Sequence, residues 1–130
     1  MQNAKKIMVI EDSELLHRMY DLIFMNLKSK GWQLIHANNG KEAFEKLHLH
    51  PDTALIILDI NMPVMSGLEF LLHRNKMNAF KEIPVIIVST EGREEDTIRG
   101  LEAGAKAYIK KPFQPSSLIK IIDKLLNKTT

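Results

Sequence analysis

Short hydrophobic runs alternate with amphipathic stretches along the chain. The runs are mostly aliphatic or β-branched, which is typical of buried strands, and they cover residues 7–10, 32–37, 55–58, 84–88 and 107–109. After each run, apolar positions recur at helical spacing. The pattern therefore predicts five strands, each followed by a helix, with the helices at 13–30, at 40–50, from 66 onward, at 93–103 and at 115–126.

Polar and small residues fit the expected ends of these helices. Ser13 is suited to cap the first helix, and Gly31 ends it. Gly104 closes the fourth helix, and Pro115 suits the first position of the fifth. The apolar stripes predicted for the first and third helices are Leu15, Met19, Leu22, Ile23 and Leu27, and then Leu68, Leu71 and Leu72.

The order of the elements indicates the fold class. Apolar strands that alternate with helices favour a parallel sheet that is covered by helices on both faces, with right-handed crossovers. Five strands are too few for the closed barrel, which has eight. We therefore predict an α/β fold with an open, doubly wound sheet. In such sheets, binding sites form outside the carboxyl ends of the strands, where the strand order reverses.

Composition narrows the class of protein. A chain of 130 residues with 45% hydrophobic and 26% charged residues has the size and balance of one domain. It has no cysteine, which excludes disulfides and thiolate zinc sites, and its net charge of +2 is too mild to indicate nucleic-acid binding. No apolar run approaches the ~20 residues of a membrane helix, and acidic residues come too early for a signal peptide. We expect a cytoplasmic protein that binds neither nucleic acid nor membrane.

Polar side chains of related chemistry follow the ends of the predicted strands. Glu11 and Asp12 follow the first strand, and Asp59 follows the third. Ser89 and Lys111 follow the fourth and fifth. If the first, third and fourth strands are neighbours, these groups meet at one edge of the sheet. Three carboxylates that lie close together disfavour joint ionisation, and Mg²⁺, which prefers oxygen ligands, relieves that repulsion.

Each of these residues has a simpler explanation when it is considered alone. An Asp after a strand is usually a turn residue or a helix cap, and the acidic pair or Ser89 could cap the helices that follow. A lysine pair is usually surface charge, and Tyr108 alone would be packing. We favour the functional interpretation because all five coincidences would have to fall at matching strand ends. The five histidines and seven methionines receive no functional role.

Together, these motifs resemble a known family. They are similar to the receiver domain of two-component response regulators, most closely its single-domain CheY-like type, through Glu11-Asp12, Asp59, Asn61-Met62-Pro63, Gly67, Ser89 and Lys111-Pro112-Phe113. The resemblance covers nearly the whole chain. It implies a flavodoxin-like (βα)5 three-layer sandwich with strand order 2-1-3-4-5. It also implies a single receiver domain over residues 1–130 without an output domain.

The resemblance implies a phosphorylation site. Asp59 corresponds to the phosphoacceptor. The implied ligands of Mg²⁺ are Asp12, Asp59, the backbone carbonyl of Asn61 and, through a water molecule, Glu11. These roles are consistent with the chemistry of phosphoryl transfer. When a carboxylate attacks phosphorus, the transferring phosphoryl group is anionic and needs a metal ion and a cationic side chain around its oxygens.

Other residues correspond to the family's switch and its self-dephosphorylation. Lys111 would pair with a phosphoryl oxygen, and Lys111-Pro112 matches a bond that the family holds in the cis form. Ser89 would be the switch hydroxyl, at a position where many relatives have threonine, and Tyr108 the rotating aromatic switch. Asn61 and Glu91 would flank the path of the hydrolytic water, which implies a phosphoryl lifetime of seconds to minutes.

The implied function is a phosphorylation-activated switch of a two-component phosphorelay. Its partners would be a histidine kinase or a phosphotransfer protein, and a downstream protein that docks on the helix at 93–103, the strand at 107–109 and the last helix. The resemblance implies a regulatory protein rather than an enzyme. It also implies a monomer that can dimerise once phosphorylated.

Three other classes remain as alternatives. A Mg²⁺-dependent aspartyl-nucleophile phosphatase usually carries its nucleophile on the first strand and a second acid two residues on, where this chain has Asn61. A flavin carrier needs a phosphate-cradling loop after the first strand, where this chain has acids. A pseudo-receiver binds partners without phosphorylation. A phosphodonor assay with and without Mg²⁺ separates these classes from a receiver.

Overall fold

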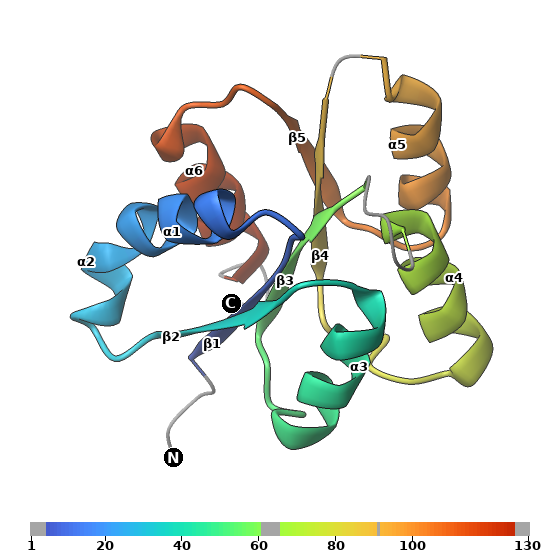
Figure 1. The fold of residues 1–130 in the computed structure, drawn as a ribbon, viewed down its shortest axis with the longest axis horizontal. Helices are drawn as coiled ribbons and strands as arrows, with labels where there is room; N and C mark the ends of the chain where they lie inside the picture. Colours follow the sequence, from blue (N-terminus) through green and yellow to red (C-terminus); the bar gives the residue numbers. More distant parts are fainter. Residues whose placement is uncertain (1–4, 61–65, 91, 127–130) are drawn as a thin grey trace.

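The computed structural model describes residues 5–60, 66–90 and 92–126, with a parallel sheet at the centre of the molecule (Figure 1). Its strands are β1 (Lys6–Ile10), β2 (Gln33–Ala37), β3 (Leu55–Asp59), β4 (Val85–Ser89) and β5 (Ala107–Lys110). Their order across the sheet is β2-β1-β3-β4-β5, which confirms the predicted doubly wound topology. The strand order reverses at β1 and β3, because the chain first adds β2 on one side of β1 and then β3 on the other.

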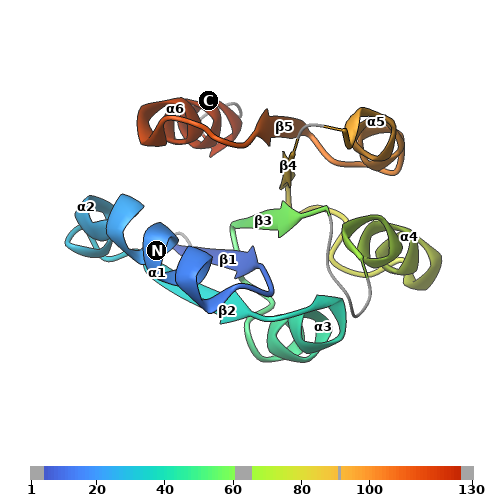
Figure 2. The same cartoon turned by 45° about the horizontal axis from the view of Figure 1, so that its top comes forward.

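Helices cover both faces of the sheet, as Figure 2 shows. In the described part of the chain they are α1 (Glu14–Ile23), α2 (Met25–Lys28), α3 (Gly40–Leu49), α4 (Gly67–Met77), α5 (Glu94–Glu102) and α6 (Pro115–Leu126). α3, α4 and α5 lie on one face, and α1, α2 and α6 lie on the other. The result is the expected three-layer sandwich. Among the described residues, no helix combines the length and the apolar character needed to cross a membrane.

Two hydrophobic cores lie on opposite faces of the central strands. Met8 and Ile10 of β1 belong to the core under α3 and α4, whereas Ile7 and Val9 belong to the core under α1 and α6. Alternate residues of a strand point to opposite faces. Because β1, β3 and β4 lie inside the sheet, both sets are buried. This double burial explains why these strands appear in the sequence as continuous apolar runs.

The first predicted helix is interrupted. The sequence predicts one helix between Ser13 and Gly31, whereas the chain forms α1 and α2, which are separated at Phe24 with φ −97° and ψ 14°. The ring of Phe24 is buried and stacks on Tyr20 with ring centroids 6.3 Å apart. Phenylalanine has only moderate helix propensity, so we attribute the interruption to the packing of this ring.

The predicted apolar stripe of α1 is wrong for Leu15 and Leu22, which are 74% and 68% exposed. The side of α1 that faces the sheet instead buries His17 and Tyr20. Both of these buried residues carry polar atoms, so the pattern of apolar residues at helical spacing did not include them. It indicated residues on a neighbouring face of α1 instead. In α4, the predicted Leu72 is also largely exposed. The other members of the α1 stripe do pack against the core: Met19, Ile23 and Leu27.

Candidate functional site

The register between β1 and β3 determines which acids meet at the carboxyl edge of the sheet. Ile10 of β1 lies opposite Leu58 of β3. The next residues along the two strands, Glu11 and Asp59, therefore reach the edge at the same level. This is the point where the strand order reverses, at which open α/β sheets form their binding sites.

The register on the other side of β3 adds a hydroxyl and a cation. Asp59 lies opposite Val88, and Ser89 lies opposite Lys110. The backbone N–H of Lys111 donates to the carbonyl of Ser89 at 2.7 Å, which fixes the start of the loop after β5. The peptide bond between Lys111 and the following proline is cis, as expected. Ser89 and Lys111 therefore belong to the same edge as the acids.

Three carboxylates converge at this edge and form what we call the acidic cluster: Glu11, Asp12 and Asp59. One carboxylate oxygen of each lies within 4.8 Å of the others. Glu11 is only 2% exposed and Asp59 is buried, whereas Asp12 faces solvent. Burial and the nearby charge of Asp59 raise the pKa of Glu11 to about 7, although Lys111 opposes the shift. The cluster therefore gathers more negative charge than it readily holds at neutral pH without a cation.

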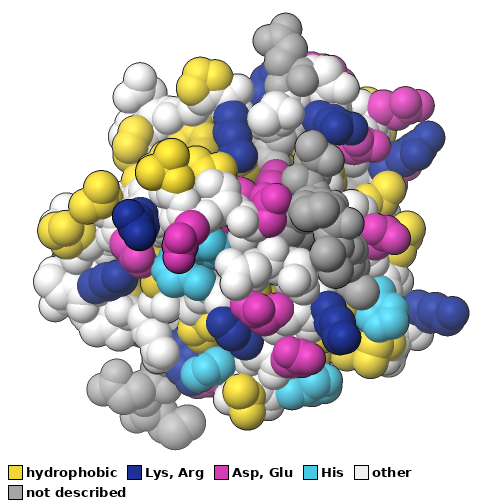
Figure 3. Space-filling model, in the orientation of Figure 1, with side chains coloured by type: hydrophobic (Ala, Val, Ile, Leu, Met, Phe, Trp, Pro, Cys, Tyr) yellow, Lys and Arg dark blue, Asp and Glu magenta, His cyan; other side chains and the backbone are white. Residues whose placement is uncertain are grey.

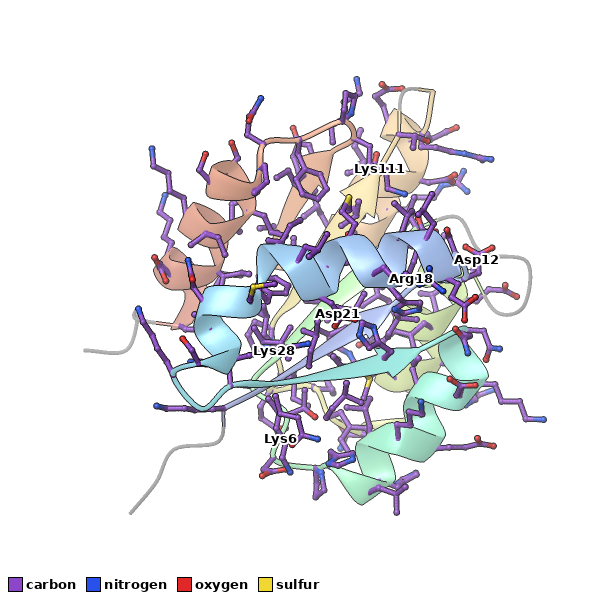
Figure 4. The ribbon with its side chains drawn as sticks, turned by 60° about the vertical axis from the view of Figure 1, so that its left-hand side comes forward. Lys6, Asp12, Arg18, Asp21, Lys28 and Lys111 are labelled. Carbon is purple, nitrogen blue, oxygen red and sulfur yellow. The ribbon has the colours of Figure 1, made fainter. Side chains whose placement is uncertain are left out.

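Backbone contacts fix the loop that carries the acidic pair. The Glu11 N–H donates to the Ala37 carbonyl at 2.9 Å, and the Glu11 carbonyl accepts from His17 Nε2 at 2.6 Å. Glu11 Oε2 accepts from the N–H of Ser13 at 3.1 Å. Ser13 in turn caps α1 by accepting from the N–H of Leu16, as predicted. The Glu11 side chain is therefore held at the start of α1 (Figure 4, where the neighbouring Asp12 is labelled).

The second carboxylate oxygen of Glu11 shows whether the acidic cluster suits Mg²⁺. Oε1 is buried, and no group among the described residues donates a hydrogen bond to it. Its ion-pair partner, Lys111 Nζ, lies 3.8 Å away, which is beyond hydrogen-bond distance. A buried carboxylate oxygen needs a donor, and a water molecule bound to Mg²⁺ is one. With Asp12 open to solvent, this donor set fits a hydrated Mg²⁺ ion.

Gly67 allows the start of α4 to approach the end of β3. A Cβ atom at this position would lie 2.6 Å from the Asp59 carbonyl oxygen and 2.7 Å from Ile60 Cα. The Gly67 N–H donates to the Ile60 carbonyl at 3.2 Å. Both neighbours are backbone atoms at the end of β3, so a side chain here would displace β3 itself.

Ser89 and Tyr108 line one cavity of about 220 Å³ between β4, α5 and β5. Ser89 is buried, and its Oγ lies 3.4 Å from the Thr90 carbonyl oxygen. Tyr108 is 52% exposed on β5. The predicted switch residues thus share a space on the side of the sheet away from α1.

The structure brings most of the predicted site residues to one edge of the sheet. Those at the edge are Glu11, Asp12, Asp59, Ser89 and Lys111. Tyr108 lies apart from the acids and reaches the edge only through the cavity it shares with Ser89. The predicted positions Asn61 and Glu91 lie outside the described residues. Figure 4 shows Asp12 and Lys111 near the first turn of α1.

Sequence reasoning missed a second polar cluster beside the first. His17 of α1 and His36 of β2 contact each other through their Nδ1 atoms, and His36 Nε2 donates to an Asp21 oxygen at 2.9 Å. We call these three residues the histidine cluster. It reaches the acidic cluster through the Glu11 carbonyl. The available signal was a histidine on the inner face of α1, which becomes visible only when that face is placed correctly.

Comparison with known proteins agrees with this geometry. The sequence profile of the response regulator receiver domain matches residues 7–123. This chain belongs to the response regulator receiver family. The match runs from β1 into α6, so it includes the acidic pair, Asp59 at the end of β3 and Lys111 in this receiver.

Individual relatives show how far the likeness extends. The receiver is 38% identical over 122 residues to chemotaxis protein CheY1 of Helicobacter pylori strain J99, covering 93% of the receiver and 96% of that protein. It is 34% identical over 125 residues to the phosphate regulon transcriptional regulatory protein PhoB of Escherichia coli K12, covering 96% of the receiver and 53% of PhoB. The solved structure of chemotaxis protein CheY4 of Vibrio cholerae matches with a TM-score of 0.81 and 30% identity, over 95% of the receiver and 99% of that chain. The receiver is therefore CheY-like and belongs to two-component signalling, as its motifs predicted.

Proposed function

We propose that this receiver is a phosphorylation-activated switch that accepts a phosphoryl group on Asp59 from a histidine kinase or a phosphotransfer protein. The observation that carries the proposal is the convergence of the acidic cluster and Lys111 at the carboxyl edge of the central strands. Turn or capping roles do not account for it, because each buried acid raises the cost of ionising the others. A site that binds a cation together with an anionic group does account for this convergence.

Asp59 is the group suited to act as nucleophile, because β3 holds it rigidly at the edge of the sheet. In the proposed step, a carboxylate oxygen of Asp59 bonds to phosphorus while the bond between phosphorus and the imidazole nitrogen of a donor phosphohistidine breaks. The leaving imidazole keeps the electron pair of that bond and takes a proton from solvent. Lys111 would place a positive charge next to a phosphoryl oxygen and pair with it.

Mg²⁺ is the proposed cofactor, and when bound it neutralises charge on the phosphoryl oxygens. The residues that would hold it are Asp12, Asp59 and the backbone carbonyl of Asn61, with Glu11 acting through a water molecule. Glu11 Oε1 suits that role, since it is buried without a hydrogen-bond donor from the described part of the chain. Asp12 keeps the ion accessible from solvent.

We further propose that the receiver regulates a partner and is not itself an enzyme. A phosphatase of the aspartyl-nucleophile type would need an acid two residues after Asp59, and the sequence has Asn61 there. A pseudo-receiver would not need the full acidic cluster together with Lys111. The pseudo-receiver is separated from the proposal by the experiment below.

The proposed output surface consists of α5, β5 and α6. Tyr108 lies outward, and the cavity of about 220 Å³ that it lines with Ser89 is open to its ring; a cavity of roughly 150 Å³ is enough for benzene. We expect Ser89 to move toward the phosphoryl group and donate a hydrogen bond, after which Tyr108 turns inward. This is a two-state change that local chemistry biases.

A groove of about 560 Å³ has Tyr108 among its lining residues, so its shape would change with the position of Tyr108. It is lined mainly by apolar side chains and by two lysines: Leu101, Lys106, Ala107, Tyr108, Ile121, Lys124 and Leu125. We propose that the downstream protein docks in this groove. When Tyr108 leaves its outward position, the end of the groove changes shape.

The acceptor assignment is tested with a small phosphodonor, acetyl phosphate, and intact-mass measurement. We expect one phosphoryl group in Mg²⁺ and none in excess chelator. Asp59→Asn should accept none, while Asp123→Asn, a matched control on the exposed side of α6, should react like the original chain. Acid-labile phosphate on Asp59→Asn would refute the acceptor, and a chain that never reacts would favour a pseudo-receiver.

The switch is tested with fluorotyrosine, because the chain has only two tyrosines. Tyr20 is buried near the acidic cluster, where Glu11 and Asp59 act on its hydroxyl, so its resonance reports ligand binding, whereas Tyr108 reports the switch. We expect beryllofluoride with Mg²⁺ to shift the Tyr108 resonance and Ser89→Ala to reduce that shift. An unchanged Tyr108 resonance would contradict the proposed output mechanism while leaving the acceptor assignment intact.

A further inference from the structure

The histidine cluster lies on the other side of Glu11 from the acidic cluster. The rings of His17 and His36 meet edge to face, with centroids 4.4 Å apart and planes at 88°. His17 is buried, whereas the His36 side chain is 29% exposed. Figure 3 shows histidine side chains at the surface beside acidic ones in the region of α1 and β2, and Figure 4 shows Asp21 on the side of α1 that faces β2.

The partners of the two rings determine which ring nitrogens carry hydrogen. His17 Nε2 contacts the Glu11 carbonyl, which can only accept, so this nitrogen carries a hydrogen. His36 Nε2 contacts Asp21 in the same way. Burial opposes ionisation of Asp21, but the hydrogen bonds from His36 and Lys28 outweigh it and lower its pKa, so Asp21 is a carboxylate. In each neutral ring, the hydrogen is therefore on Nε2 and the lone pair is on Nδ1.

The two Nδ1 atoms face each other, so two lone pairs point at one position. Such an arrangement is repulsive unless a positive charge lies between them. The same arrangement is the one that metal-binding histidines have, in which the second ring nitrogen donates to a carboxylate or a backbone carbonyl and thereby orients the ring. Here Asp21 serves one ring and the Glu11 carbonyl serves the other.

We propose that His17 and His36 form a binding site for a divalent transition-metal ion such as Zn²⁺, with both Nδ1 atoms as ligands. The site is distinct from the acidic cluster and does not depend on phosphorylation. Imidazole ligands suit Zn²⁺, Cu²⁺ and Ni²⁺, whereas Mg²⁺ prefers oxygen ligands. The two clusters therefore select different metals although they share Glu11 as a neighbour.

The surroundings allow such an ion to enter. Bonds of ~2.0–2.1 Å from zinc to nitrogen require the two Nδ1 atoms to move apart from their close contact. His36 can yield because it lies on an edge strand with part of its side chain in solvent. Water completes the coordination from that open side.

The neighbouring charges are nearly balanced before the metal binds. Lys28 pairs with Asp21 at 3.0 Å, and Lys46, which also donates to the His36 carbonyl, pairs with Glu42 at 3.3 Å. Each lysine thus has an acidic partner. A divalent ion does not meet an uncompensated positive charge from either of them.

The test is a competition titration with a chromophoric zinc indicator, using the full chain, Zn²⁺ alone as the probe and excess Mg²⁺ to fill the acidic cluster. We expect one equivalent of Zn²⁺ to bind. His17→Gln and His36→Gln should each abolish this equivalent. Asp21→Asn should weaken binding by roughly 10-fold or more, because a partner that orients a ligand is lost. His48→Gln, an exposed histidine on α3, should bind like the original chain.

Circular dichroism of each variant shows whether it is folded, and His36→Gln on the edge strand decides the matter if His17→Gln does not fold. Cu²⁺ offers a second readout, since electron paramagnetic resonance should detect two imidazole nitrogens in the original chain and no such site in His36→Gln. The proposal is wrong if the original chain takes up no stoichiometric Zn²⁺, or if both glutamine variants keep it. A ¹⁵N signal for a proton shared between the rings in excess Zn²⁺ would also overturn it.

Discussion

The acidic cluster and the histidine cluster share Glu11, yet burial shifts the pKa values of their buried groups in opposite directions. The Glu11 side chain belongs to the first, while its carbonyl holds His17 of the second. In both, the interior disfavours the charged form. For the acid this raises the pKa of Glu11 to about 7, and for the base it lowers the pKa of His17.

The consequences for stability therefore run in opposite directions with pH. The contribution of Glu11 is fully present below pH 4.5, its ordinary pKa, and is lost as the pH rises through about 7. The contribution of His17 is present above pH 6.5, its ordinary pKa, and is lost as the pH falls through the lowered value. Two adjacent buried groups can thus respond oppositely to one change of pH.

The largest expected effect comes from a substitution that disturbs the acidic cluster and not the histidine cluster. Gly67→Ala places a Cβ against the backbone of Asp59 and Ile60 at 2.6 and 2.7 Å. Because neither contact is with a flexible side chain, we expect a loss of about 3 kcal/mol or more in the free energy of unfolding. Phosphorylation by acetyl phosphate should fall with it. Urea denaturation and intact mass measure both effects.

Gly31→Ala is the matched control. Gly31 has φ +95°, and the nearest atom to a new Cβ is the Lys5 Cδ at 4.0 Å. The change should cost about 1–2 kcal/mol from backbone strain and leave phosphorylation unchanged. Equal losses in the two variants would contradict the view that Gly67 serves the close approach to β3.

A second prediction concerns the metal-free acidic cluster. Between pH 4.5 and 7, the folded chain holds the Glu11 proton more tightly than the unfolded chain, so the contribution of Glu11 to stability should fall as the pH rises. The shift corresponds to at most ~3 kcal/mol. In chelator, Glu11→Gln should remove most of this loss and be more stable than the original chain at pH 7.5. Adding Mg²⁺ should stabilise the original chain more than the variant, because the variant keeps Asp12 and Asp59 but lacks the Glu11 carboxylate.

The opposite result is easily recognised. If the original chain in chelator becomes more stable from pH 4.5 to 7, and Glu11→Gln follows the same curve, then Glu11 is not a strained acid. Thermal denaturation at a series of pH values, at constant ionic strength, measures the difference.

A smaller effect is expected from the histidine cluster. His17→Leu removes the donor to the Glu11 carbonyl, which is then left buried without its hydrogen bond, and this should cost about 1–3 kcal/mol. The loss should be greatest above pH 6.5 and shrink as the pH falls, because the original chain loses the same contribution there. His48→Leu on the exposed side of α3 should change stability by no more than ~0.5 kcal/mol. Chemical denaturation in chelator compares the two, and a pH-independent loss for His17→Leu would contradict the assignment.

The sequence was sufficient for the sheet and for the acidic cluster, for a common reason. Strands that are buried on both faces are continuously apolar, so β1, β3 and β4 can be identified from the sequence. A parallel sheet then places the residues at their carboxyl ends along one edge. Glu11, Asp59 and Lys111 could therefore be predicted to meet without any coordinates.

The histidine cluster could not be predicted in this way, because it depends on which side of α1 faces the sheet. The hydrophobic pattern of α1 includes Leu15 and Leu22, which are exposed, and does not include His17, which is buried. The interruption at Phe24 has a similar origin, since it reflects how one ring packs. Side-chain packing of this kind is a tertiary property that local pattern does not encode.

The central claim is that Asp59 is the group that becomes phosphorylated. Its most direct measurement is to treat the chain with acetyl phosphate and Mg²⁺, reduce any acyl phosphate with borohydride, and locate the product by peptide mass spectrometry. Reduction converts a phosphorylated aspartate into homoserine, and we expect homoserine at position 59 alone, with none when Mg²⁺ is chelated. Homoserine at position 12, reduction of Glu11, or an unmodified Asp59 in a chain that carries phosphate would contradict the claim.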